Sequence, residues 1–221
     1  MQRHFDEELK ELNQEILKMG ILAEESIQRS VEALKNRDKK MAEAVINEDA
    51  RVDQLELDID EKCIDLIARY QPIAGDLRFI AIGMKLNAEL ERIADIAVDI
   101  AQRVLEIADK PQLKPLIDIP KLTTIAQNMV KMSVDAFLKK DVKLAKEVIL
   151  SDSDADQLRN LIQRELIEDY MAKDGSTAHR AIQYLLVARF LERICDHATN
   201  IAEDVIYMVH AEVVRHHPEK L

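Results

Sequence analysis

The sequence predicts an all-α protein made of two tandem three-helix bundles. Its 221 residues include only four glycines and five prolines, so few positions favour the tight turns that a β-protein requires. Apolar residues recur at spacings of three and four along most of the chain, and this period is typical of amphipathic helices. The hexapeptide LERIAD of residues 90–95 returns as LERICD in residues 191–196, which indicates an internal duplication.

The first half of the chain contains three predicted helices. Apolar spacing carries the first helix to about Asn36, and Asp38 is a suitable N-cap for the second. The second helix continues to about Tyr70, where Pro72 and Gly75 interrupt the pattern. The third helix follows and carries the LERIAD hexapeptide.

A proline-rich segment divides the chain. Three prolines occur in residues 111–120, and proline both lacks a backbone donor and disfavours helix in the residue before it. We therefore expect a first three-helix repeat in residues 1–110, a linker in residues 111–120 and a second three-helix repeat in residues 121–221.

The second half repeats the pattern of the first. Its helices are expected at about residues 120–139, 142–172 and 176–212. Asp141 precedes the fifth helix as Asp38 precedes the second, and it can cap that helix in the same way. Helices of roughly 30 residues are about 45 Å long at 1.5 Å per residue, so two such bundles laid side by side would form one elongated body.

Charge and cysteine usage limit the classes of partner. The formal net charge of −11 and the pI of about 5.1 disfavour nucleic acid and anionic lipid, and favour basic protein surfaces or cations. No apolar run reaches the roughly 18 residues of a membrane span, and the N-terminus lacks the apolar segment of a signal peptide. Cys63 and Cys195 have neither metal-type spacing nor a disulfide pattern, so we interpret them as buried thiols of a cytoplasmic protein.

The repeated hexapeptide carries an acidic stripe. On a helical wheel its carboxylates fall on one side of each third helix, opposite the apolar positions, so we expect them to face away from the core. The stripe consists of Glu91, Asp95 and Asp99 in the first copy, and of Glu192, Asp196 and Asn200 in the second.

The second helix of each repeat adds a carboxylate pair, Asp49 with Asp53 and Asp152 with Asp156. If helices two and three align in register, each repeat collects four carboxylates on its outer surface. Like charges four residues apart repel by a few tenths of a kcal/mol, so such a set is unfavourable unless a cation lies on it. Oxygen-only ligands suit Mg²⁺, Mn²⁺, Ca²⁺ or iron. The alternative is a solvated charged face, with Arg92 and Arg193 as partial counterions.

Other kinds of site find less support in the sequence. The glycine-rich phosphate loops, the zinc-protease HExxH and the GxSxG motif of hydrolases do not occur. A ferritin-like di-iron centre needs Glu-x-x-His pairs that point into the core, and no glutamate here has a histidine three residues later. His197 follows Asp196 and could add a nitrogen ligand, although an exposed or capping histidine is the more common case.

Three stretches carry a resemblance to a known family. The opening FDEELKEL of residues 5–12, the LERIxD of each third helix and the DHATNIAED of residues 196–204 resemble the PhoU family of phosphate-transport regulators. The resemblance covers nearly the whole chain and implies a pseudo-two-fold repeat of three-helix bundles. Many family members have glycine before the motif aspartate, where Ala94 and Cys195 stand here, and both of these residues are also small.

The resemblance implies a cytoplasmic, non-enzymatic adaptor that represses the phosphate-starvation response and high-affinity phosphate uptake. The implied partners are the ATPase subunit of the phosphate ABC transporter and the phosphate sensor histidine kinase, so contact with the membrane would be peripheral, through those complexes. Some family members bind metal at the surface motifs, and the donors do not distinguish Fe, Mn, Mg and Zn. By motif match the candidate metal ligands are Asp49, Asp53, Glu91, Asp95, Asp152, Asp156, Glu192 and Asp196.

Two other functions remain open at this point. Carboxylate-bound metals can activate water, so a metal-dependent hydrolase of phosphorylated small molecules is one alternative. A plain helical scaffold, in which the duplication serves packing alone, is the other. A homodimer is compatible with a long bundle, although no spacing in the sequence requires one.

Overall fold

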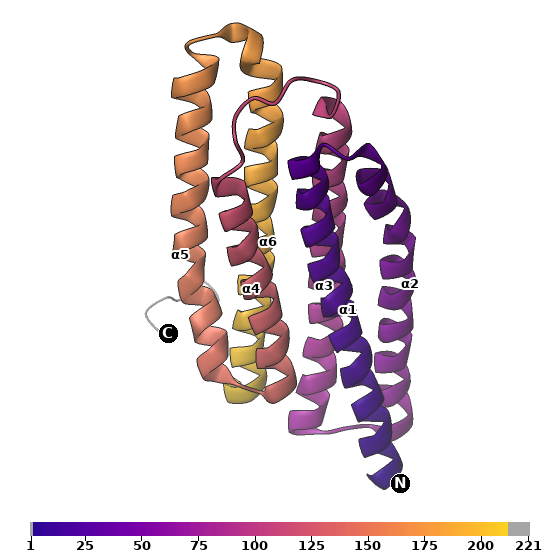
Figure 1. The fold of residues 1–221 in the computed structure, drawn as a ribbon. Helices are drawn as coiled ribbons and strands as arrows, with labels where there is room; N and C mark the ends of the chain where they lie inside the picture. Colours follow the sequence, from indigo (N-terminus) through magenta and orange to yellow (C-terminus); the bar gives the residue numbers. More distant parts are fainter. Residues whose placement is uncertain (1, 212–221) are drawn as a thin grey trace.

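The computed structural model describes residues 2–211, in which six long helices and no strand occur (Figure 1). This confirms the predicted all-α class. The helices are α1 (Gln2–Asn36), α2 (Lys39–Tyr70), α3 (Ala74–Ile107), α4 (Asp118–Lys139), α5 (Val142–Glu165) and α6 (Ala178–His210). Residues 212–221, which belong to the expected second repeat, lie outside the described residues.

Each repeat is a bundle of three mutually packed helices. The helices α1, α2 and α3 contact one another, as do α4, α5 and α6, and the two bundles join where α3 lies against α6 and α1 against α4. The two bundles therefore stand side by side in one elongated body, with α2 and α5 at its outer edges (Figure 1). Buried apolar side chains from all six helices form one continuous core.

Both predicted N-caps are confirmed. A carboxylate oxygen of Asp38 accepts a hydrogen bond from the backbone N–H of Met41 at 3.1 Å. Asp141 accepts from the N–H groups of Lys143 at 2.9 Å and Leu144 at 3.1 Å. Such caps satisfy backbone donors that the first helical turn leaves unpaired, and each contributes about 1 kcal/mol to stability.

Three boundaries differ from the sequence-based expectation. The fourth helix begins at Asp118, so Pro120 lies in its first turn, where the missing N–H would have no helical acceptor. The single helix expected over 142–172 is instead α5 followed by a wider π-helical turn, η1 (Leu166–Met171). A 3-10 turn, η2 (Gly175–Thr177), then precedes α6.

The two bundles pack antiparallel. At the start of α3, the Arg78 Nε donates to the carbonyl of Met208 near the end of α6, at 3.2 Å. The Phe79 ring stacks on the Phe137 ring of α4, with centroids 4.6 Å apart and planes 20° apart. Since the beginning of one helix meets the end of its counterpart, the repeats are related by an approximate two-fold rotation.

A glycine allows the first and fourth helices to approach closely. A Cβ atom placed on Gly20 of α1 would lie 3.1 Å from a methyl carbon of Val134 on α4, which is tighter than normal packing. The backbone of α1 therefore uses the space that a side chain would otherwise take, and the contact between the repeats depends on the absence of that side chain.

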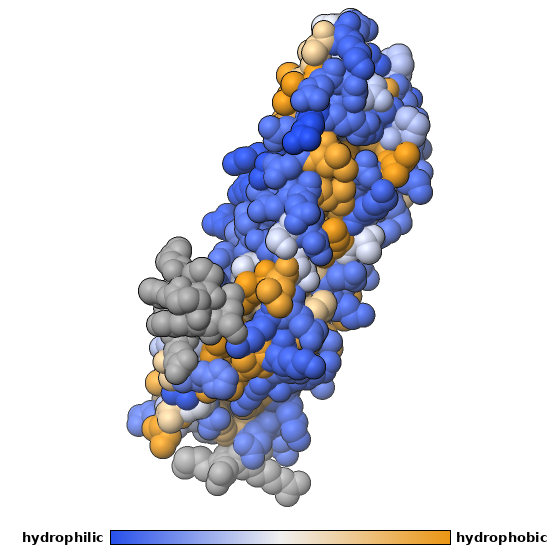
Figure 2. All heavy atoms as spheres, turned by 90° about the vertical axis from the view of Figure 1, so that its left-hand side faces the viewer, coloured by the Kyte–Doolittle hydropathy of each residue, from blue (hydrophilic) through white to orange (hydrophobic). Residues whose placement is uncertain are grey.

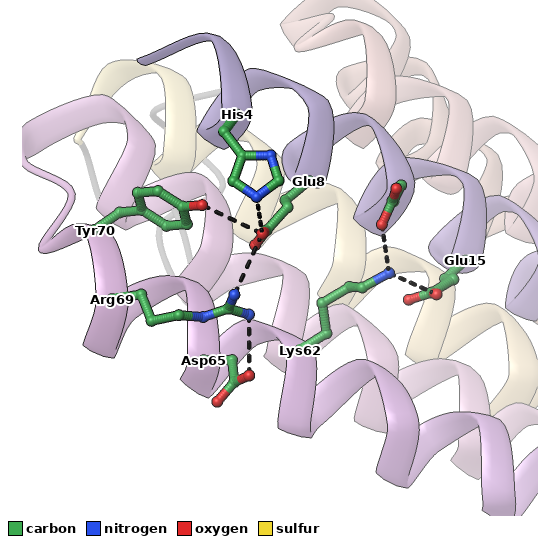
Figure 3. A network of polar contacts seen from close by, with 8 residues as sticks. His4, Glu8, Glu15, Lys62, Asp65, Arg69 and Tyr70 are labelled. Atoms are coloured by element: carbon green, nitrogen blue, oxygen red, sulfur yellow. Dashed lines mark hydrogen bonds and ion pairs between the residues drawn. The ribbon is translucent and has the colours of Figure 1, made fainter. Parts of the chain in front are cut away.

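Salt bridges join α1 to α2 in the first bundle (Figure 3). The Lys62 ammonium lies 2.7 Å from a Glu15 oxygen, and an Arg69 nitrogen lies 3.3 Å from Glu8. The Tyr70 hydroxyl donates to the same Glu8 oxygen at 3.2 Å. Along this seam, acidic side chains of α1 face basic side chains of α2, and the opposite charges neutralise each other.

The surface is mainly hydrophilic, with scattered apolar side chains. Figure 2 shows the side on which α5 lies in Figure 1, where patches of hydrophobic atoms interrupt the hydrophilic surface. The exposed apolar residues of α5 are Leu150 and Leu161. No helix within residues 2–211 has an apolar stretch long enough to cross a membrane. Both cysteines are buried and free, as predicted.

Candidate functional site

The α2–α3 seam of the first repeat gathers the predicted acidic residues. Asp49 and Asp53 lie one turn apart on α2, and Glu91 and Asp95 lie one turn apart on α3. The register of the two helices brings them together, because Asp49 interacts electrostatically with Asp53 and Asp95, and Glu91 does so with Asp95 and Asp53.

Glu56 belongs to the same group. It lies on α2 one turn after Asp53 and interacts electrostatically with Glu91. It did not enter the predicted set, although its place on α2, three residues beyond Asp53, puts it on the same helix face. We call Asp49, Asp53, Glu56, Glu91 and Asp95 the first carboxylate cluster.

The second repeat gathers its four predicted carboxylates in the same way. Asp152 on α5 interacts electrostatically with Asp196, Asp156 and Glu192. Asp196 on α6 interacts in turn with Glu192 and Asp156. We call Asp152, Asp156, Glu192 and Asp196 the second carboxylate cluster. All eight predicted residues thus lie in one or other of two groups, one in each repeat.

The two motif glutamates are less exposed than the sequence predicts. The helical wheel places the stripe away from the core, but the side chains of Glu91 and Glu192 are only 16% and 14% exposed. The reason is that α2 and α5 lie beside the stripe and cover its base. The motif aspartates remain at the rim, where Asp196 is exposed and Asp95 is partly exposed.

Burial and mutual repulsion make the first cluster hold protons unusually tightly. Burial, followed by the charge of Asp95, raises the pKa of Glu91 to about 7, although Arg92 opposes this shift. Burial, followed by the charges of Asp53 and Asp95, raises the pKa of Asp49 to about 6. The exposed Arg92 compensates the charge of this cluster only in part.

The second cluster shows the same effect. Burial is the main cause that raises the pKa of Asp152 to about 6, and the charges of Asp196, Asp156 and Glu192 add to it. The pKa of Asp196 is also raised by burial and by Glu192, while His197 and Arg159 oppose the shift.

The counterions of the two clusters come from different helices. In the first repeat, Arg92 of α3 lies 3.2 Å from an Asp95 oxygen and 3.6 Å from Glu91, and its side chain is 65% exposed. In the second repeat, Arg159 of α5 lies 3.1 Å from a Glu192 oxygen, and its side chain is only 22% exposed. Arg92 and Arg193 were the predicted counterions. Arg159 was not predicted, because it lies on α5 and not on α3 or α6, the helices that carry the LERIxD motif (the motif helices).

His197 and Asn200 point to the other repeat. The His197 Nδ1 lies 2.5 Å from the Oε2 of Glu89 on α3, and the Asn200 amide donates to the same oxygen at 3.4 Å. In this arrangement the two side chains tie α6 to α3. His197 is therefore a contact between the repeats rather than a nitrogen ligand of the second cluster.

Comparison with known protein families finds one domain twice in this chain. A family model described as "PhoU domain" matches residues 16–104 and again residues 119–205. The chain belongs to the PhoU family. The two matches fall on the two helical bundles, and so confirm the duplication inferred from the repeated hexapeptide. The limits 1–110, 111–120 and 121–221 stay predictions.

Relatives named as PhoU proteins match almost the full length of the chain. A "phosphate-specific transport system accessory protein PhoU homolog" of Aquifex aeolicus is 42% identical over 95% of this chain and 94% of its own. The homolog of Clostridium acetobutylicum is 37% identical over 93% and 94%. The crystal structure of PhoU from Pseudomonas aeruginosa superposes with a TM-score of 0.89 at 35% identity, covering 94% of this chain and all of that one.

The two clusters of this PhoU protein differ in how well they fit a metal. Within residues 2–211, no group of three or more His, Cys, Asp or Glu side chains is arranged so that it could hold a metal ion. The first cluster nonetheless has the donors for a hard cation, since it offers carboxylate oxygens whose charge is poorly compensated. In the second cluster a guanidinium already lies against two of the carboxylates.

Proposed function

We propose that this protein is a non-enzymatic accessory protein that regulates phosphate transport and represses the phosphate-starvation response and high-affinity phosphate uptake. Relatives that match almost the full length of the chain are named for the phosphate-specific transport system, and a solved relative from Streptococcus pneumoniae is titled a phosphate transport system regulatory protein. The single observation that supports a binding role is the first carboxylate cluster, a half-buried acidic group on an outer edge of the body.

The proposed partners are the ATPase subunit of the phosphate ABC transporter and the phosphate sensor histidine kinase. The protein would act as an adaptor between them, in the cytoplasm, and would reach the membrane only through these complexes. A net charge of −11 favours basic surfaces on such partners, because complementary charge speeds encounter and fixes orientation. The edge helices α2 and α5 contact only their own repeat, so a partner can approach either of them from outside.

We also propose that the carboxylates bind a divalent or trivalent metal ion. The residues that would hold it are Asp49, Asp53, Glu56, Glu91 and Asp95 in the first repeat. The four predicted residues of the second repeat offer the same kind of donor, but Asp156 and Glu192 already contact Arg159. A bound cation would relieve the repulsion among half-buried carboxylates. Fe, Mn, Mg and Zn all remain candidates because the donors are oxygen atoms only.

Binding of the purified ATPase subunit to a double variant tests this function. Glu91→Ala with Asp95→Ala should weaken binding by about tenfold or more, because both residues lie in the proposed docking surface. The helical content measured by circular dichroism should not change. A matched control is Glu25→Ala with Glu43→Ala, which removes the same charge at exposed positions of α1 and α2.

Equal binding by the wild type and both double variants would remove the first cluster from the mechanism. Equal weakening by both would show that net charge, rather than the cluster, governs binding. Turnover of a simple phosphoester with Mn²⁺, lost only in the Glu91 and Asp95 variant, would instead support the hydrolase alternative.

A further inference from the structure

The two clusters differ in charge at one equivalent position. The sequence DQLE of residues 53–56 in the first repeat corresponds to DQLR of residues 156–159 in the second. Glu56 therefore adds a fifth carboxylate to the first cluster, whereas Arg159 adds a cation to the second. One substitution in the duplicated pattern thus reverses the charge facing the motif helix.

Arg159 lies among the carboxylates of the second cluster. Its Nη2 is 3.1 Å from Glu192 Oε1 on the facing helix and 3.5 Å from Asp156 Oδ1 on its own helix. Its Nη1 donates to the Asn160 side chain at 2.7 Å, and its Nε is buried without a hydrogen-bond partner. One guanidinium nitrogen thus lies against two carboxylates, as a bound metal ion would.

The first cluster has no comparable cation. Arg92 contacts Asp95 and Glu91, but it lies on the motif helix itself and is mostly exposed to water. An exposed ion pair of this kind contributes little and is easily displaced. The partly buried ion pair of Arg159 is more strongly held, because it is less screened by solvent and because removing one partner leaves the other uncompensated.

A second difference between the repeats acts in the same direction. Asn200 occupies the position that Asp99 occupies in the first repeat, so a carboxylate at this position of the acidic stripe is replaced by an amide. Its amide donates to Glu89 of the other repeat, which directs it away from the cluster.

We infer that Arg159 is a built-in cation of the second carboxylate cluster, so that the first cluster takes up an external metal ion and the second does not. This inference rests on the proposed metal binding of the first cluster. A metal entering the second cluster must displace a guanidinium that already contacts Glu192 and Asp156. In the first cluster an entering metal meets five carboxylates and displaces only an exposed arginine.

Counting bound Mn²⁺ on the full chain tests the inference, with the free ion measured by electron paramagnetic resonance. Wild type should bind Mn²⁺ at the first cluster only. Arg159→Gln should also bind Mn²⁺ at the second cluster, at least about tenfold more tightly than the second cluster of the wild type does. Arg193→Gln removes the same charge from an exposed position of α6 and should behave as wild type. Glu56→Arg leaves the second repeat untouched and should abolish uptake by the first cluster.

The inference would be overturned if the wild type bound Mn²⁺ at both clusters with equal affinity. It would also be overturned if Arg159→Gln bound the same number of Mn²⁺ ions as the wild type, including none in both. If Arg159→Gln does not fold, retention of wild-type binding by Glu56→Arg overturns it. Binding by Arg159→Gln but not by wild type would refute the proposed metal binding of the first cluster while supporting the role of Arg159.

Discussion

The Nδ1 atom of His197 on α6 lies 2.5 Å from the Oε2 atom of Glu89 on α3. This contact joins the motif helix of one repeat to that of the other at a point where both side chains are mostly buried. It lies two residues before the Glu91 motif on one helix and directly after the Asp196 motif on the other. The contact therefore links α3 and α6 beside the two carboxylate clusters.

Replacement of His197 by alanine should lower the free energy of unfolding by about 1 kcal/mol, because it leaves the Glu89 oxygen without this partner. A double-mutant cycle with Glu89→Gln, measured by urea denaturation, should give a coupling energy of about 0.5–1.5 kcal/mol. His4→Ala is the control, since the His4 side chain is 68% exposed and its loss should change stability by less than about 0.5 kcal/mol. Full additivity of the two substitutions would contradict this account.

Stability should fall as the pH rises from about 5 to 8. The folded-state pKa values of Glu91, Asp49 and Asp152 are raised to about 7, 6 and 6, above the ordinary values of these carboxyls. The folded state therefore binds more protons than the unfolded state in this window, and rising pH favours unfolding. Calorimetry should show a melting temperature about 3 °C or more higher at pH 5.5 than at pH 8.

Glu91→Gln should remove part of that pH dependence, because a neutral amide has no proton to lose. The variant should melt at a higher temperature than wild type at pH 8, by about 2 °C. Glu25→Gln, at an exposed position of α1, should leave the pH dependence unchanged. A wild-type melting temperature that climbs between pH 5.5 and 8 would show that the carboxylate clusters do not govern stability there.

Gly20→Val should destabilise the contact between the repeats by about 1–3 kcal/mol, since the added methyl groups would collide with Val134. Gly75→Ala is the matched control, because nothing lies within 4 Å of a Cβ atom at that position. Alanine should be neutral there or stabilise α3 by about 0.5–1 kcal/mol. Chemical denaturation of both variants checks the pair, and a Gly20→Val protein as stable as wild type would contradict the close packing of α1 on α4.

The native thiols should be almost unreactive toward Ellman's reagent at pH 8. Burial raises the pKa of the Cys63 thiol to about 12, with Asp60 and Glu15 adding to the shift, and burial raises that of Cys195 as well. Both thiols should react within minutes once the chain is unfolded in guanidinium chloride. Rapid labelling of either cysteine in the native protein would show that its helix seam opens readily.

The helices and their caps were predictable because their signals are local. The period of apolar residues and the capping aspartates Asp38 and Asp141 act within a turn or two of the chain, so the sequence alone identifies them. The π-helical turn after Glu165 and the start of α4 at Asp118 have weaker local signals.

The acidic residues of the candidate site were predictable, but their burial and counterion were not. A helical wheel treats each helix in isolation, so it places Glu91 opposite the core without showing that α2 covers the base of the stripe. Arg159 was missed for the same reason, since it reaches Glu192 from a neighbouring helix. A comparison of residues 53–56 with 156–159 would have revealed the charge reversal before the structure did.

In the proposed function, the first carboxylate cluster is a cation-dependent docking surface in phosphate-transport regulation. The most direct test is the affinity of the wild-type protein for the phosphate transporter's ATPase subunit, measured by calorimetric titration with Mn²⁺ and again with a metal chelator. Binding should weaken by about tenfold or more when the chelator removes the metal. Binding of the same strength in both conditions would contradict the metal-dependent docking.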